Sequence, residues 1–527
     1  MSEIDFLTSQ VKRHRISRRD FLGRSAALGL TLAAASTLYG NALKAATPNQ
    51  GGTLRIGVNG GETSDSLDPT TYGTQVHLPL SRSWADQLVV VSAEDGSAQP
   101  GLAESWEPSS DVKTWVFKIR KGVVFHNGKE LTADDCAQTL KRHSAPDSTS
   151  GAAGLFKGFE SISADGDTVV CKLTEANADL PLFFTDYHLQ MQPGGGFDAP
   201  DAGIGTGPYM VKVAEHGVRY ELAKNPNYWG TDSHFDGLEI YILNDETARM
   251  AALQSGQVDL VNRVPPRTAG LLKQNANIVI ENIGGRGHYV FIAHCNTAPF
   301  DNNDLRMALK LAIDREAMVQ TVLQGYGTVG NDFPINKAYD LFPAGIEQRT
   351  YDPDKAAFHY KKSGHEGSIL LRTSDAAFPG AVDATILYQQ QAAKAGITLE
   401  IQQEPSDGYW ENVWNVQPFS ASYWGGRPTQ DQMYSTAYLS TADWNDTRFL
   451  RPDFDAIINA ARGELDRAKR AEMYAEAAMM VRDEGGLILP MFNDWVDGRS
   501  AKLEGYIKDP SFECSAGYAS RRCWFAA

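Results

Sequence analysis

The sequence predicts an α/β fold with mixed β-sheets, and three patterns lead to this prediction. Residues 246–255 carry apolar side chains at helical spacing, and residues 258–261 then read as a strand. Residues 115–120 alternate apolar and polar side chains, which is the period of a half-buried strand. Residues 289–293 are strongly apolar, as in a buried strand. A strand–helix–strand unit implies parallel pairing, with helices covering the sheet.

Short local signals predict the elements of the first half of the chain. Residues 52–58 read as a first strand after two glycines, and residues 168–173 read as another strand. Thr132 and Asp135 have the spacing of a capping box at the start of a helix over residues 133–142. Helices and strands are therefore interspersed from the start of the fold.

A glycine-rich stretch, residues 205–208, precedes two strand patterns at residues 209–213 and 220–223, which predict a β-ribbon. Glycine loops that bind phosphate lead into a helix and end in Lys-Ser or Lys-Thr. This stretch leads into a strand and lacks that pair, so nucleotide binding is not expected.

Helices and strands also alternate in the second half. Residues 301–325 predict two successive helices, with Asp314 as the N-cap of the second and Gly325 at its end. The other predicted helices cover residues 355–362, 382–395, 454–462 and 467–482, and the other predicted strands cover residues 369–372, 398–402 and 487–492. The chain after residue 46 shows neither an internal repeat nor a low-complexity tract.

Residues 1–46 are expected to be a signal peptide rather than part of the fold. Residues 17–22, Ser-Arg-Arg-Asp-Phe-Leu, resemble the twin-arginine export motif. Residues 25–38 form a weakly apolar run too short for a comfortable membrane span, and residues 42–46 offer a cleavage region. A cytoplasmic amphipathic helix is the alternative. Since no cysteine directly follows the apolar run, we expect export in a folded state to the periplasm without a lipid anchor.

The charge of the chain argues against nucleic acid or anionic lipid as partners. The formal net charge is −16, and residues 1–46 hold seven Lys or Arg against three Asp or Glu, so the remainder carries −20. Such a chain repels other polyanions. The charge does not constrain a small ligand, because a local site can oppose the global sign. The remainder is long enough for two or three domains.

The cysteine and histidine patterns do not support a metal or a cofactor. The chain has five cysteines: Cys136, Cys171, Cys295, Cys514 and Cys523. No two of them have the spacing of a C-x-x-C pair. The last two are close enough in sequence to pair in an oxidising compartment, which leaves at least one free thiol. The eleven histidines show no i, i+4 pair on a predicted helix.

Longer stretches along the whole chain after residue 46 resemble one family. They read GGTLRIGV with SLDP, QPGLAESWEPSSDVKTWVFKIRKGVVFHNGKELTADD, GTGPYMVKV with KNPNYWG, AALQSGQVDL, and FDNNDLRMALKLAIDREAMVQTVLQGYG. Together they resemble the family-5 extracellular solute-binding proteins of ABC importers, the dipeptide- and oligopeptide-binding group.

The resemblance implies a two-lobed periplasmic binding protein fold, type II and cluster C-like, with an extra subdomain inserted in lobe I and a central ligand cleft. Mapped onto this chain, lobe I covers residues 47–86, 201–285 and 488–527, the inserted subdomain covers 87–200, and lobe II covers 286–487. The lobes would be joined by crossings near Gly285 and Leu487.

The resemblance also implies the function of a monomeric, periplasmic substrate-binding component of an ABC transporter. It would capture a peptide-like or other small polar solute and deliver it to permease subunits in the inner membrane. A ligand that contacts both lobes stabilises the closed form, and moving from mostly open to mostly closed needs about 5 kcal/mol. A ligand sensor that feeds a receptor is an alternative on the same fold.

Arg427 distinguishes this chain from the peptide-binding relatives. In them, the third residue after the cleft tryptophan is an aspartate that pairs with the α-amino group of the peptide. Here Trp424 matches the tryptophan, and the third residue after it is Arg427. Because arginine repels ammonium and attracts carboxylate or phosphate, we expect an acidic ligand, such as an opine-like conjugate, an acidic sugar derivative or a modified peptide.

Two alternatives to an Arg427 anchor stay open. Arg427 can pair with Asp431 or Asp443 and merely hold its loop. Asp431 can also replace the lost aspartate after a shift in loop geometry, which would restore peptide binding.

Further ligand contacts follow from mapping the family fold onto the chain. The candidates are aromatic or polar residues at the predicted cleft: Tyr72, Thr74, Tyr409, Trp410, Tyr423, Phe492 and Asn493. For the aromatic residues, ordinary core packing is the alternative.

No catalytic residues are expected. The sequence has neither a G-x-S-x-G nucleophile elbow nor an H-E-x-x-H motif. Acidic pairs such as Asp134 and Asp135 lie at a predicted helix start, where they complement the helix dipole. A periplasmic hydrolase is the alternative function class.

Overall fold

The computed structural model describes nearly all of the chain after the expected signal peptide. Described are residues 48–94, 96–145, 148, 150–374, 376–405, 409–442 and 444–526, together with 4, 7, 16–28, 30, 31, 34–36, 38 and 39. The predicted cleavage region, residues 42–46, and Asp443 lie outside this part, as does the side chain of Trp410. Near the start, the twin-arginine stretch lies in helix α2 (Arg18–Ala27), which Ser17 caps.

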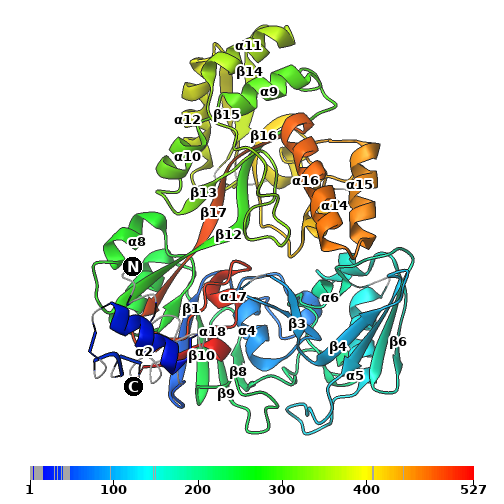
Figure 1. Ribbon diagram of the computed structural model, residues 1–527, viewed down its shortest axis with the longest axis vertical. Helices are drawn as coiled ribbons and strands as arrows, with labels where there is room; N and C mark the ends of the chain where they lie inside the picture. Colours follow the sequence, from blue (N-terminus) through cyan, green and yellow to red (C-terminus); the bar gives the residue numbers. More distant parts are fainter. Residues whose placement is uncertain are drawn as a thin grey trace.

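One long mixed sheet runs through the molecule from end to end (Figure 1). Its order, among the described residues, is β15-β14-β16-β12-β17-β11-β1-β10-β9-β8, and β13 pairs with β17. The strands are β1 (Thr53–Val58), β8 (Tyr209–Glu215), β9 (Arg219–Lys224), β10 (Gly237–Ile242), β11 (Leu260–Val261), β12 (Ile278–Ala293), β13 (Gly327–Val329), β14 (Ile369–Thr373), β15 (Leu399–Gln403), β16 (Phe419–Trp424) and β17 (Leu487–Ser500). Among the described strands, only β12 and β17 extend through both halves of the molecule, and we call them the hinge strands.

Lobe I is built on the β8 side of the sheet. Its strand β1 pairs in parallel with β10 and with β11, as the strand–helix–strand pattern predicts. The predicted helix between β10 and β11 is confirmed. Asp245 caps its start, and Gly256 ends it in the left-handed conformation. The helices of this lobe are α4 (His77–Trp84), α7 (Glu246–Ser255), α8 (Pro266–Leu272), α17 (Glu513–Ala516) and α18 (Ala519–Arg522), and β18 (Leu503–Glu504) pairs with β19 (Trp524–Phe525).

A smaller antiparallel sheet, in the order β4-β5-β7-β6, lies beside this lobe. Its strands are β4 (Ala103–Pro108), β5 (Thr114–Ile119), β6 (Phe159–Asp165) and β7 (Thr168–Leu173). The same part of the chain holds a separate two-stranded sheet of β2 (Val89–Val91) and β3 (Ala98–Pro100), and the helices α5 (Ala133–Ser144) and α6 (Leu180–Phe183). The predicted capping box is confirmed, since Thr132 Oγ1 accepts from Asp135 N and the Asp135 carboxylate accepts from Thr132 N. The sheet has a hydrophobic core of its own around Phe117.

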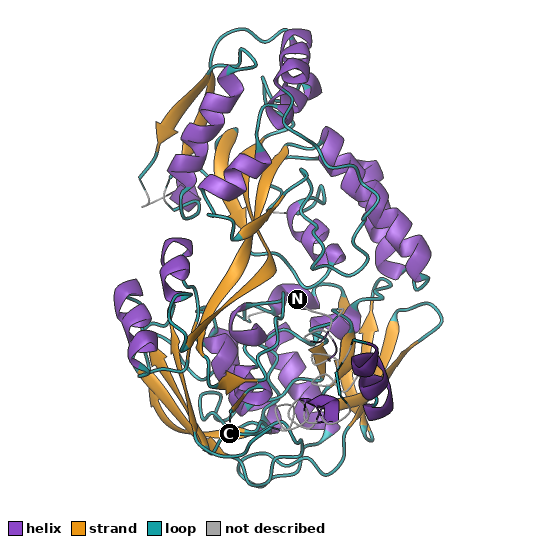
Figure 2. Cartoon of the chain, turned by 60° about the vertical axis from the view of Figure 1, so that its left-hand side comes forward, coloured by secondary structure: helices purple, strands orange, loops and turns teal. Residues whose placement is uncertain are grey.

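Lobe II covers the β15 side with helices on both faces of the sheet (Figure 2). They are α9 (Asn303–Leu311), α10 (Arg315–Thr321), α11 (Pro353–Ser363), α12 (Ala381–Ala393), α13 (Tyr409–Asn412), α14 (Gln430–Ala437), α15 (Pro452–Gly463) and α16 (Arg467–Glu484). Successive side chains of β12 point to opposite faces. Phe291 therefore enters one hydrophobic core, and Val290 and Ile292 enter the other.

The hinge strands are much longer than the predicted strands at residues 289–293 and 487–492. Gly284, Gly285 and Gly287 hide the strand pattern of β12 in the sequence. They lie where the pairing with β17 shifts register between Gly284 and His288. A Cβ on Gly285 would lie 2.7 Å from the Trp495 ring, so glycine is required for the two strands to pass each other. The predicted lobe boundaries themselves stay a prediction.

A buried ion network holds lobe II to the hinge strand β17. The fully buried carboxylate of Asp332 accepts hydrogen bonds from Arg315 at 2.6 and 2.7 Å and from Leu489 N at 2.9 Å, and it pairs with Arg349 at 2.9 Å. Burial opposes its charge, but the two guanidinium groups outweigh burial and lower the pKa of Asp332.

We expect Asp332→Ala to destabilise the protein by about 3–5 kcal/mol, because it leaves two guanidinium groups buried without their carboxylate. Denaturant unfolding followed by circular dichroism measures the loss. The control is Asp453→Ala, which removes an exposed partner of Arg451 and should cost much less stability than Asp332→Ala. Equal losses in the two variants would contradict a dominant role for the buried network.

Candidate ligand-binding site

Arg427 lies where β16 ends beside the hinge strand β12. The antiparallel pairing of these strands places Trp424 opposite His288. Gly426 follows with φ 78°, and a Cβ at this position would lie 2.5 Å from the Cβ of Arg286. The loop can therefore pass against the hinge only with glycine there, and this passage places Arg427 next to the hinge.

The guanidinium of Arg427 is half-buried and has no negatively charged partner among the described residues. It lies over the Trp424 ring at 5.6 Å and donates one hydrogen bond to Gly426 O at 2.6 Å. Its backbone N–H donates to the Tyr339 hydroxyl at 3.0 Å. In the described part of the chain, no carboxylate lies within ion-pair distance of it. Burial lowers the pKa of Arg427, while the charge of Asp186 in lobe I opposes this shift from beyond contact distance.

Asp431 does not compensate Arg427. Its buried carboxylate accepts hydrogen bonds from Arg462 Nε at 3.0 and 3.1 Å and from the Ser435 hydroxyl at 3.1 Å. The alternative of an Arg427–Asp431 pair is therefore wrong. Since both oxygens are engaged inside lobe II, the structure also gives no sign that Asp431 replaces the lost aspartate. The Asp443 alternative lies outside the described residues.

Three tryptophans form a cluster, and Arg427 lies over the ring of one of them, Trp424. The rings of Trp414, Trp424 and Trp444 lie 5.9 to 6.3 Å from one another. Buried Asp446 accepts hydrogen bonds from the indoles of Trp414 and Trp424 at 3.0 and 3.1 Å and fixes their orientation. Trp444 is 50% exposed and offers ring surface for stacking.

The sequence prediction missed Trp414, Trp444 and Asp446. They lie up to 22 residues away from Trp424 in sequence, and no local pattern links them. The one available signal was the number of tryptophans on either side of the Arg427 stretch.

The structure brings some of the other candidates to the same region. Phe492 on β17 lies 5.3 Å from the ring of buried His288, and Asn493 is the next residue along the hinge strand. Burial lowers the pKa of His288 to about 4, with the charge of Arg427 acting in the same direction. Tyr423 is 49% exposed and projects from the opposite face of β16 to Trp424. Their contact with a ligand stays a prediction.

Three further candidates are engaged by residues of their own lobes. Tyr72 packs in the core of lobe I, stacked on His77 at 4.2 Å, and the Thr74 hydroxyl donates to Asp65 at 2.9 Å. Tyr409 packs in a core of lobe II, where its hydroxyl donates to Ala421 O at 2.8 Å. Both tyrosines therefore pack in hydrophobic cores in this structure.

A family model described as bacterial extracellular solute-binding proteins, family 5 middle, matches residues 97–446. The chain belongs to the family-5 bacterial extracellular solute-binding proteins. The predicted family and its two-lobed fold are thereby confirmed, as is the role of a substrate-binding component that works with an ABC permease.

Relatives of this solute-binding protein are similar over most of their length. Heme-binding protein A of Haemophilus influenzae is 26% identical over 84% of this chain and 87% of the relative. The dipeptide-binding protein of Escherichia coli is 26% identical over 78% of this chain and 84% of the relative. The solved structure of the PBP AgaA from A. tumefacien R10 has a TM-score of 0.73 and 21% identity, over 90% of this chain and 99% of that one.

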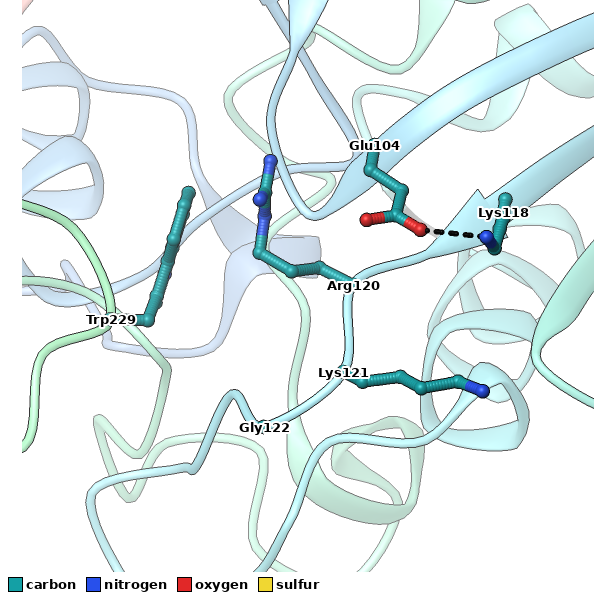
Figure 3. A pocket seen from close by; sticks show the side chains of 6 residues that line it. All are labelled: Glu104, Lys118, Arg120, Lys121, Gly122 and Trp229. Atoms are coloured by element: carbon teal, nitrogen blue, oxygen red, sulfur yellow. Dashed lines mark ion pairs between the residues drawn. The ribbon is translucent and has the colours of Figure 1, made fainter.

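A surface pocket of about 490 Å³ lies elsewhere, beside the small sheet (Figure 3). Lys118 in this pocket pairs with Glu104 at 3.1 Å, and the Arg120 guanidinium stacks on Trp229 at 4.7 Å. Two of its three cations thus pair with carboxylates, Lys118 with Glu104 and Lys121 with Asp167, and the pocket contains none of the predicted site residues. We therefore place the candidate site at Arg427 rather than here.

The described residues contain no cluster of three or more His, Cys, Asp or Glu side chains that could hold a metal ion. None of their helices has the length and apolar character needed to cross a bilayer. Cys514 and Cys523 are both buried as free thiols, so the disulfide considered for them is not formed in this structure.

We expect Asp446 to make stability depend on pH. Burial raises its pKa to about 7, with the two indole N–H groups opposing. Because an unfolded aspartate titrates near pH 4, the contribution of Asp446 is full below about pH 4 and is lost as the pH rises through about 7. Asp446→Asn stays neutral and keeps an acceptor, so its Tm should fall less than the wild-type Tm between pH 5 and pH 8, by roughly a few degrees.

Thermal unfolding followed by tryptophan fluorescence measures this difference. The exposed Asp301→Asn variant serves as the control and should follow the wild-type pH profile. An Asp446→Asn profile parallel to that of the wild type would show that the buried carboxylate does not titrate in this range.

Proposed function

We propose that this solute-binding protein captures a small solute with an acidic group, anchors that group on Arg427, and delivers the solute unaltered to an inner-membrane permease. The observation that carries the proposal is a half-buried guanidinium next to the hinge with no carboxylate partner among the described residues. A cation held this way is costly unless a ligand supplies the opposite charge.

The local chemistry supports a ligand with both an acidic and a flat portion. Arginine presents paired N–H donors to a carboxylate or phosphate, and such charge-assisted bonds strengthen as a closing site excludes water. The half-exposed Trp444, backed by Trp414 and Trp424, offers a surface on which a ring or another flat group can stack.

The relatives do not identify the ligand of this chain, because they are named for different ligands. Those reported above are named for heme and for dipeptides, and AgaA was solved with agropinic acid. Two local differences from a site that binds the α-amino group of a peptide support an acidic ligand here. Arg427 stands where an aspartate is expected, and the nearby Asp431 is neutralised by Arg462.

We further propose that the protein is a monomeric binder rather than an enzyme, and that it works in the periplasm after twin-arginine export, without a lipid anchor. The Ser-Arg-Arg-Asp-Phe-Leu stretch and the short apolar run behind it support this route. A hydrolase remains testable, because it would release a product that differs from what it bound.

The experiment is to denature the purified protein, identify any released small molecule by mass spectrometry, and measure its rebinding by calorimetry. We expect a compound with an acidic group. Arg427→Gln should weaken its binding by about 30-fold or more, since truncating one partner of a buried charge pair costs 2–5 kcal/mol.

Lys394→Gln is the matched control, because it removes an equal charge from an exposed position on lobe II and should leave affinity unchanged. A neutral or purely amine-bearing ligand, or full affinity in Arg427→Gln, would overturn the acidic anchor. Chemical conversion of the compound on incubation would overturn the assignment as a binder.

A further inference from the structure

Lobe I and lobe II touch at a second place, away from the hinge strands. Asp179, which precedes α6, accepts a hydrogen bond from Arg470 on α16 at 2.8 Å, across 291 residues of sequence. Both side chains are nearly buried, with 8% and 10% of their surface exposed. In Figure 1, α6 lies against the ends of α14, α15 and α16, whereas β12 and β17 cross elsewhere.

Backbone contacts surround this ion pair. Ala178 N donates to Arg462 O at 2.7 Å, which joins the segment before α6 to the end of α15. A Cβ on Gly463 would lie 3.0 Å from the Cβ of Ala176, so the two chains are packed together there. The contact surface thus consists of residues 175–179 of lobe I and residues 462–470 of lobe II.

We propose that this contact, which we call the latch, holds the two lobes together and sets the balance between the closed and the open forms through the Asp179–Arg470 ion pair. Neither residue belongs to the site around Arg427, so the latch acts separately from the bonds that the ligand makes. The inference depends on the two-lobed fold and not on the acidity of the ligand.

The electrostatics of the pair suit a reversible contact. Burial is the main influence on Asp179 and raises its pKa to about 6, with Asp431 adding to this effect and Arg470 opposing it. Arg470 Nε has no partner among the described residues. Desolvation therefore offsets much of the attraction between the charges, and separation of the lobes returns both groups to water.

Removal of one partner changes this balance. In the closed form, Arg470→Gln leaves the Asp179 carboxylate buried without its cation, whereas the open form exposes it to water. The closed-to-open ratio should therefore fall at least about tenfold. Asp179→Asn, on the other lobe, should act in the same direction. Replacement of both by apolar residues, as in Asp179→Leu with Arg470→Met, should restore much of the closure.

The test is small-angle X-ray scattering on the purified protein after ligand has been removed by denaturation and refolding. The scattering curve is fitted as a mixture of the closed structure and an opened one. Arg482→Gln is the matched control, because Arg482 lies at the opposite end of the same helix, outside the latch, and pairs with Asp483 inside lobe II at 2.6 Å. It should scatter as the wild type does.

Three results would overturn the latch. They are a wild-type curve that requires no closed form, unchanged curves for both Arg470→Gln and Asp179→Asn, or equal opening by Arg482→Gln. If Arg470→Gln does not fold, Asp179→Asn decides alone. Because no ligand is present, these outcomes are independent of whether Arg427 binds an acid.

Discussion

The fold depends on the pairing of the hinge strands β12 and β17. Their ladder of backbone hydrogen bonds extends from Ile278 opposite Ser500 to Ile292 opposite Leu487, and it belongs to both lobes. In the large sheet, β16, β14 and β15 follow on the β12 side, β11, β1, β10, β9 and β8 follow on the β17 side, and β13 pairs with β17 near its middle. The site is organised around the same ladder, because Gly426 packs on Arg286 and Trp424 pairs with His288 at its middle.

Local signals predicted most of the regular elements, because caps, turn residues and apolar spacing act over a few residues. The capping box at Thr132 and the helix ending at Gly256 are examples. The full length of β12 could not be predicted in the same way. Its glycines serve the crossing of two strands that are about 200 residues apart, and that requirement does not appear in local sequence.

The candidate site was predictable in part for the same reason. The exchange of an aspartate for Arg427 is visible in one short stretch, once the family resemblance locates it. The partner of Asp431 is Arg462, and the partners of Trp424 are Trp414, Trp444 and Asp446, all supplied by tertiary contacts. Tyr72 and Tyr409 were plausible as wall residues by sequence position, but hydrophobic packing places their rings inside the lobes.

The connection between the lobes is a pair of hydrogen-bonded strands and not a flexible linker, and this restricts how the halves can move. A paired ribbon bends and twists readily about the bulge at Gly284 to His288, but it resists stretching and sideways shear, because those motions break its hydrogen bonds. The two lobes therefore approach and separate along nearly one path. Each approach then returns the same side chains to the same mutual positions, which gives a membrane partner a reproducible shape to recognise.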